Sequence, residues 1–143
     1  MKSRKNLQEN SVNYIQHYKK SLSLLVLQAT LAILWNVAGL WLISQGKEGL
    51  GPQATGAAIV LLILLIIGYI VSLKRGFDTI YLFFAFVAFI ISFYGIATGL
   101  TRSHSLWISE FWRYMGMLIH VLGIIGFVYA LMTFSKKRKE RLG

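Results

Sequence analysis

The sequence predicts an all-α integral membrane protein, a bundle of four transmembrane helices with both termini in the cytoplasm. Of its 143 residues, 56% are hydrophobic and only 14% are charged, which leaves too few polar side chains to cover a soluble globule. Four apolar runs are each long enough to cross a bilayer, which takes about 20 residues in a helix. Basic residues gather in alternate connecting segments, as they do when these segments share one side of a membrane.

The basic residues predict the orientation. Twelve of the fifteen lysines and arginines lie in the N-terminal segment, the middle turn and the C-terminal tail, and only Lys47, Arg102 and Arg113 lie in the other two loops. By the positive-inside rule, both termini are cytoplasmic. The net charge of +10 is therefore interpreted as a topology signal, and no nucleic-acid partner is expected. Short loops, the absence of cysteine and the absence of a glycosylation sequon favour a bacterial cytoplasmic (inner) membrane.

We expect a single domain over residues 1–143, because no linker is long enough to separate two. The four spans are predicted at 21–44, 54–72, 79–100 and 112–134. Before them, apolar residues of the segment 6–20 recur at helical spacing (Leu7, Ser11, Tyr14, Ile15 and Tyr18). This pattern predicts an amphipathic helix on the inner leaflet, and a solvated basic segment is the alternative.

A basic tail, 135–143, follows the last span. It is expected to contact anionic lipid, in addition to marking the cytoplasmic side. The basic residues concerned are Lys136, Lys137, Arg138, Lys139 and Arg141.

Stripes of small residues predict how the helices pack, because small side chains let two membrane helices approach closely. The first span carries Ala29, Ala32, Asn36 and Gly39 on one face, and the third carries Ala85, Ala88, Ser92, Gly95 and Gly99. The fourth carries Gly116, His120 and Gly123. The middle of the second span, 58–67, has no polar side chain and is predicted to face lipid or a partner.

The loops carry their own signals. Glycines and Pro52 make 45–53 a turn, and the tryptophan-containing loop 101–111 is predicted to form a short interfacial helix. The stripes of the first and third spans are 56 residues apart, and an Ile-Ile-Gly-aromatic motif in the second and fourth is repeated after 58 residues. A duplicated two-helix hairpin would produce this pattern, and chance similarity between small-residue-rich spans is the alternative.

His120 is the only strongly ionisable side chain well inside any span, and such a residue is a functional-site hypothesis by default. Counting inward from the outer ends, Asn36, Ser92 and His120 all lie about 12 to 14 Å below the outer interface at 1.5 Å per residue. The sequence therefore predicts a polar layer of these three residues. It would be either an interhelical hydrogen bond or a ligand or proton site.

No residue pattern predicts catalysis, a metal site or a cofactor. The chain has no cysteine and a single aspartate, Asp78, which lies on the opposite side from His104 and well away from His120. Paired carboxylates, a phosphate-binding loop and a Ser-His-Asp set are all missing from the pattern. We therefore favour a protein that is not an enzyme.

Three functions remain open at this point. The first is a non-enzymatic accessory or assembly subunit that packs against a larger membrane complex. The second is a small oligomeric carrier or channel whose polar pathway contains Asn36, Ser92 and His120. The third is a lipid- or quinone-handling membrane enzyme that uses His120. The expected partners are the lipid bilayer and either another protein or further copies of the chain.

Overall fold

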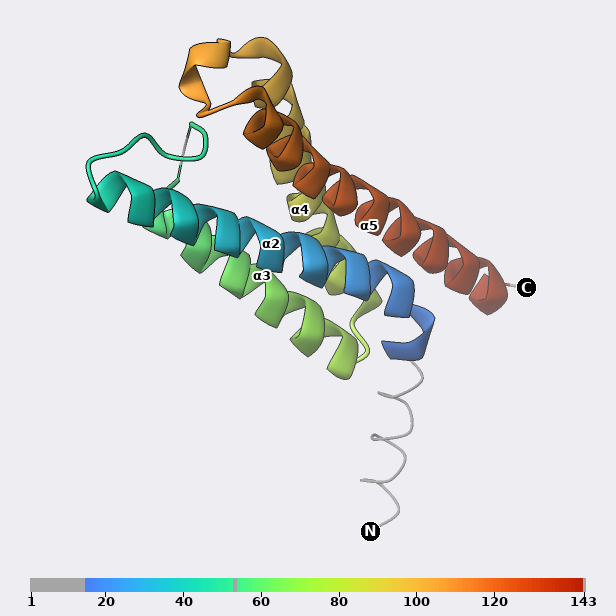
Figure 1. Ribbon diagram of the computed structural model, residues 1–143. Coiled ribbons are helices and arrows are strands. Elements are labelled where there is room, and N and C mark those ends of the chain that lie inside the picture. Colours follow the sequence, from blue (N-terminus) through green and yellow to red (C-terminus); the bar gives the residue numbers. More distant parts are fainter. Residues whose placement is uncertain (1–14, 53, 143) are drawn as a thin grey trace.

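The computed structural model describes residues 15–52 and 54–142, with the side chain of Arg141 excluded. Its helices are α2 (Lys19–Ser44), α3 (Gly56–Lys74), α4 (Asp78–Thr101) and α5 (Glu110–Leu142), with a 3₁₀ turn, η1 (His104–Leu106), before α5 (Figure 1). The predicted all-helical fold with four long apolar helices is confirmed for the described residues, since all four are long and apolar enough to cross a membrane. Residues 6–14, which make up most of the predicted amphipathic segment 6–20, lie outside the described residues.

The four helices form an antiparallel bundle in which each packs against two others. Consecutive helices are neighbours in space, and α5 returns to pack against α2 as well as α4. In Figure 1, α2 and α3 run side by side as one pair, with α4 and α5 forming the other. The start of α2, the α3–α4 turn and the end of α5 therefore lie at one end of the bundle, called the inner end below. The loop 102–109 and the described parts of the other loop, 45–52 and 54–55, lie at the outer end.

Glycines of α5 set its distance from α2. A Cβ added at Gly126 would lie 2.9 Å from the side chain of Leu25, so the two helices are already at minimum separation there. Three turns along α5 toward the outer end, the site of a Cβ on Gly116 lies 3.5 Å from the Trp35 ring. The two helices thus stay in contact over several turns, as expected where small residues line a helix interface.

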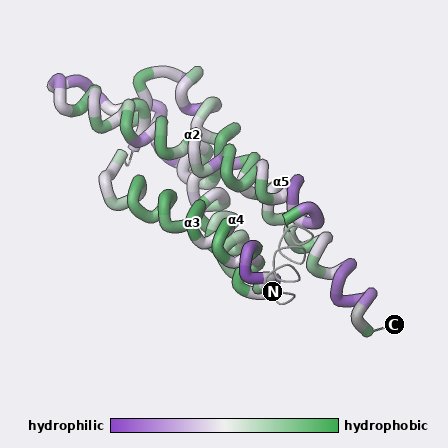
Figure 2. The backbone as a smooth tube through the Cα atoms, turned by 90° about the horizontal axis from the view of Figure 1, so that it is seen from below, coloured by the Kyte–Doolittle hydropathy of each residue, from purple (hydrophilic) through white to green (hydrophobic). Residues whose placement is uncertain are grey.

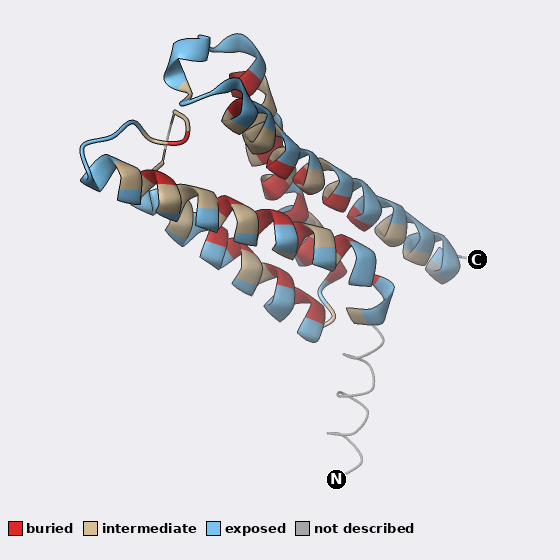
Figure 3. Cartoon of the chain, viewed as in Figure 1, coloured by how far each residue is buried: buried red, intermediate tan, exposed pale blue. Residues whose placement is uncertain are grey.

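The apolar surface faces outward, as it must in a membrane. Large hydrophobic side chains such as Leu34, Val60, Phe93 and Leu118 are more than half exposed, and buried residues follow the inner side of each helix (Figure 3). Hydrophilic residues gather toward the ends of the bundle (Figure 2). The four alanines predicted to pack, Ala29, Ala32, Ala85 and Ala88, are all buried.

Two segments differ from expectation. Helix α5 continues through the basic tail to Leu142, because residues 135–142 contain neither glycine nor proline and are rich in lysine, arginine and glutamate, which are good helix formers. The loop expected to form an interfacial helix has only the single turn η1. The hydroxyl of Ser103 accepts a bond from the Ser105 N–H, which favours a local turn over a continuous helix. The other predicted bounds lie within two residues of α2, α3 and α4.

Candidate functional site

A cavity of about 160 Å³ lies among the four helices in the outer half of the bundle. Its walls come from all four helices and from both outer loops. Apolar side chains such as Leu62 and Ile91 line part of it, together with Trp35 and Trp107. The polar side chains that line it are Gln28, Asn36, Tyr94, Thr98 and His120.

Gln28 is the most unusual of these residues. It is only 1% exposed, and neither its amide nitrogen nor its amide oxygen has a hydrogen-bonding partner in the described structure. Its side chain lies against Gly123 of α5, where an added Cβ would approach Gln28 Cγ to 3.3 Å. Each buried polar atom without a partner costs about 1 to 3 kcal/mol, so burying this amide lowers the free energy of unfolding considerably.

His120 reaches the same cavity from α5. Its ring lies directly on Gly95 of α4, and a Cβ at that glycine would overlap the ring. The ring nitrogen Nδ1 is buried and has no hydrogen-bonding partner among the described residues. Gly95 therefore makes room for an imidazole that presents an unused polar atom inside the bundle.

Trp107 closes the cavity at the outer end. It follows η1, and its ring lies so close to Gly51 in the other outer loop that a Cβ at Gly51 would overlap it. The same ring lies 3.5 Å from the site of a Cβ on Gly116 of α5. Its Nε1 is buried and has no hydrogen-bonding partner in the part of the chain that the structure describes. Two glycines thus let one indole seal the space between the loops and α5.

Asn36 and Ser92 are placed differently from each other. Asn36 lines the cavity, but its amide is already used: Nδ2 donates to Ala32 O at 2.8 Å, and Oδ1 accepts from the Thr55 N–H at 3.2 Å. Ser92 is fully buried against Gly123, outside the cavity lining, and its Oγ has no described partner. The structure therefore brings two residues of the predicted layer, Asn36 and His120, to one cavity and places Ser92 outside it.

The glycines predicted to pack all lie against another part of the chain. Gly99 faces Met117, Gly123 faces Ser92, and Gly39 faces Ala54, whose Cβ lies 2.7 Å from the site of an added Cβ. Gly39 and Gly95 occupy equivalent positions in the proposed hairpin repeat, yet the first meets the segment before α3 and the second meets the middle of α5. The two hairpins therefore pack in different registers.

The polar groups suit binding rather than acid-base chemistry. The described lining has no Asp, Glu, Lys or Arg, and the described residues contain no group of three or more side chains that could hold a metal ion. Trp107 Nε1 can only donate a hydrogen bond, whereas an amide such as that of Gln28 can donate and accept. A molecule that offers hydrogen-bond acceptors would satisfy these groups together.

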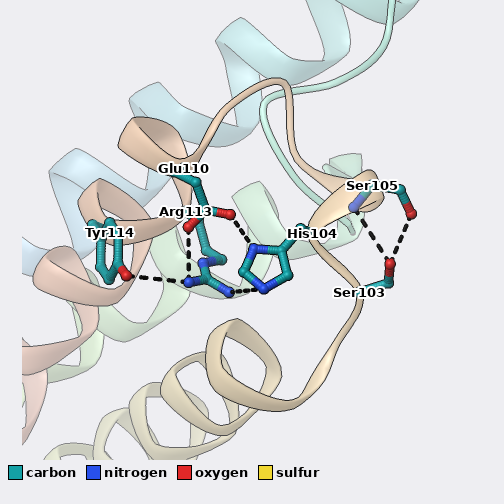
Figure 4. Close-up of polar contacts among 6 residues, drawn as sticks. All are labelled: Ser103, His104, Ser105, Glu110, Arg113 and Tyr114. Atoms are coloured by element: carbon teal, nitrogen blue, oxygen red, sulfur yellow. Dashed lines mark hydrogen bonds and ion pairs between the residues drawn. The ribbon is translucent and has the colours of Figure 1, made fainter.

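A second polar cluster lies at the outer surface (Figure 4). The Glu110 carboxylate contacts His104 Nδ1 and accepts a bond from Arg113 at 2.8 Å, while Arg113 Nη1 lies 3.3 Å from His104 Nε2. Both ring contacts are satisfied when Nδ1 carries the proton and Nε2 accepts from the guanidinium. The guanidinium also donates to the Tyr114 hydroxyl at 3.2 Å. This cluster ties the outer loop to the first turn of α5.

A third cluster lies at the inner end. Lys137 of α5 contacts both carboxylate oxygens of Asp78 at 3.2 Å, and the Lys137 side chain is 14% exposed, against 7% for Asp78. The ammonium also lies 5.5 Å from the centre of the Tyr18 ring. Lys137 is therefore held within the bundle. Among the residues expected at anionic lipid, Lys136, Arg138 and Lys139 are exposed, and the side chain of Arg141 lies outside the described structure.

Gln28 and Trp107 were not among the predicted site residues. Gln28 offers a sequence signal, because it is a polar residue inside an apolar span and lies one helical turn before Ala32 of the small-residue stripe. Trp107 offers none, since its position depends on the path of the outer loop. Comparison with known proteins yields no match to a protein-family model, a curated protein or a solved structure.

Proposed function

We propose that the chain is an integral membrane protein that binds a small molecule in the cavity among its four helices, as a carrier or receptor rather than as an enzyme. The observation that carries the proposal is the amide of Gln28, which is buried beside the cavity and has no hydrogen-bonding partner for either polar atom among the described residues. His120 Nδ1 and Trp107 Nε1 are two further buried atoms that have no partner within residues 15–52 and 54–142. A bound molecule would provide partners for all of them.

Replacing Gln28 by methionine tests the proposal. Methionine has a similar shape and no need for hydrogen bonds, so we expect Gln28→Met to raise the free energy of unfolding of the ligand-free protein by about 1 kcal/mol. The same variant should lose binding of any molecule that the parent retains from its membrane. Unfolding in mixed micelles gives the first quantity, and native mass spectrometry gives the second.

Gln45→Met is the matched control, because Gln45 is exposed at the end of α2 and does not line the cavity. This variant should change neither the stability nor the ligand content. A Gln28→Met protein that is less stable than the ligand-free parent would indicate that the amide supports the fold, and the proposal would then be wrong.

We also propose that both termini are cytoplasmic, in a bacterial inner membrane. The support is the concentration of basic residues at the inner end of the bundle, including Lys19, Lys20, Lys74 and Arg75. Since the chain has no cysteine, single cysteines at Lys47 and at Lys139 should react with an impermeant thiol reagent from opposite sides of the membrane. Equal reactivity from one side would contradict the orientation.

An accessory subunit is the second candidate. It is favoured by the exposed phenylalanines on α4: Phe83, Phe86 and Phe93 are between 46% and 61% exposed and could pack against another membrane protein. Such a subunit should purify from native membranes with a stoichiometric larger partner. A chain that purifies alone or only with further copies of itself would exclude this second function.

A further inference from the structure

The cavity has an opening on the side of the bundle. Leu61 of α3 and Tyr94 of α4 both line the cavity, yet they are 44% and 52% exposed. Side chains that belong to both the cavity wall and the outer surface mark its mouth. Since the two residues come from neighbouring helices, the mouth lies between α3 and α4 and faces the lipid.

The packing of α3 against α4 is consistent with a mouth in the outer half. In the inner half, the Phe84 ring lies against Gly68, where a Cβ would approach the ring to 2.8 Å. The centres of the Tyr69 and Tyr81 rings are 6.0 Å apart. Leu61 lies two turns outward from Gly68 along α3. At the outer end, the Trp107 ring packs against Gly51 and covers the cavity. Entry from water is therefore more obstructed than entry between α3 and α4.

The residues that line the cavity favour an uncharged ligand. A charged group placed in this cavity would have no described counter-ion in the lining and would pay a large desolvation cost. The unpaired groups include two that carry donor hydrogens, the Gln28 amide and the Trp107 indole. The head group that fits is uncharged and bears carbonyl-type oxygens, while an apolar remainder can extend through the mouth into the lipid.

We propose that an uncharged lipid-soluble molecule with a carbonyl-bearing head group enters the cavity sideways, between Leu61 and Tyr94. This inference rests on the proposed function and deepens it by naming the ligand class and the route. Quinones and diacylglycerols both have this chemistry. They are therefore the two probes that the experiment compares.

The experiment closes the mouth reversibly. Because the chain has no cysteine, Leu61→Cys with Tyr94→Cys gives one reactive pair, which a short bifunctional reagent with reducible links can join across the mouth. The matched control is Val71→Cys with Ile80→Cys, a pair on the same two helices that is similarly exposed, at 42% and 45%, but does not line the cavity. The probes are a short-chain benzoquinone, a short-chain diacylglycerol and a fatty-acid anion, each added to protein in zwitterionic nanodiscs and followed by tryptophan fluorescence.

We expect one or both uncharged probes to bind, and the fatty-acid anion not to bind. Joining the 61–94 pair should slow association by about tenfold or more, because entry would then require a larger conformational change. Reduction of the link, with the reductant removed before the probe is added, should restore the rate. The control pair should have no effect. The relative affinity of the two uncharged probes identifies which source of the head group the cavity prefers.

Three results would overturn the inference. Unchanged association after joining the 61–94 pair would exclude the lateral route. Binding of the anion in preference to both uncharged probes, or binding of none of the three, would exclude the ligand class. Failure of the proposed function itself would be seen separately, as a Gln28→Met protein that is less stable than the ligand-free parent, so the two failures can be told apart.

Discussion

Replacing Asp78 by alanine is expected to destabilise the inner end of the bundle by about 3 kcal/mol, the low end of the range for breaking a buried ion pair. Asp78 is 7% exposed, and its removal deletes its ion pair with the largely buried Lys137 ammonium. The effect stays at the low end because Lys137 keeps some contact with solvent and can extend its head group toward it. Unfolding in mixed micelles measures the change.

The double variant Asp78→Asn with Lys137→Met distinguishes the loss of the whole ion pair from the loss of one of its two charges. Because both charges are removed together, it should lose much less stability than Asp78→Ala alone. Lys139→Met is the matched control, since Lys139 is exposed two residues further along α5 and should be replaceable at little cost. If the effects of Asp78→Asn and Lys137→Met, each measured alone, simply add in the double variant, the ion pair does not couple α5 to the α3–α4 turn.

Replacing Gly95 by alanine is expected to lower the free energy of unfolding by about 2 kcal/mol, within the range for overpacking a core. The added Cβ would overlap the His120 ring, so the ring or the helices must shift. Gly95→Leu should have a larger effect, and Gly39→Leu should also destabilise, because the Ala54 Cβ lies 2.7 Å from the site of its Cβ. The same shift of His120 should reduce ligand binding.

Two further variants test this explanation. The double variant Gly95→Ala with His120→Ala removes the overlap and should recover part of the lost stability. Gly56→Ala is the control, because the site of its Cβ has no atom within 4 Å and the change should be close to neutral. Gly95→Leu and Gly39→Leu proteins as stable in detergent as the parent would contradict the close packing at these glycines.

The helices were predictable because their signals are local. Apolar runs of membrane-spanning length, interrupted by segments rich in glycine and charge, define α2, α3 and α4 to within two residues. The end of α5 could not be predicted from the apolar run. Hydropathy falls at Ser135 but helix propensity stays high, so the helix extends beyond the apolar residues. The structure of the outer loop could not be predicted either, because the hydrogen bond between the Ser105 N–H and the Ser103 hydroxyl competes with a regular helix.

Residue counting along single helices does not determine which side chains meet between helices. Counting residues from the outer ends placed Asn36 and His120 at similar depths, and both line the cavity. Ser92 lies outside because the register of α4 against α5 puts it opposite Gly123, one turn inward from the contact of Gly95 with His120. Register and helix rotation depend on side-chain packing between helices, which spacing along one helix does not determine.

The most direct test of the ligand-binding claim is native mass spectrometry of the protein extracted with its surrounding lipid. We expect the parent protein to carry a bound small molecule that survives removal of loosely attached lipid, and Gln28→Met to be free of it while remaining folded. Gln45→Met should carry the same mass as the parent. A parent protein that is bare under these conditions, or a Gln28→Met protein that retains the molecule to the same extent, would contradict the assignment of Gln28 and the cavity to ligand binding.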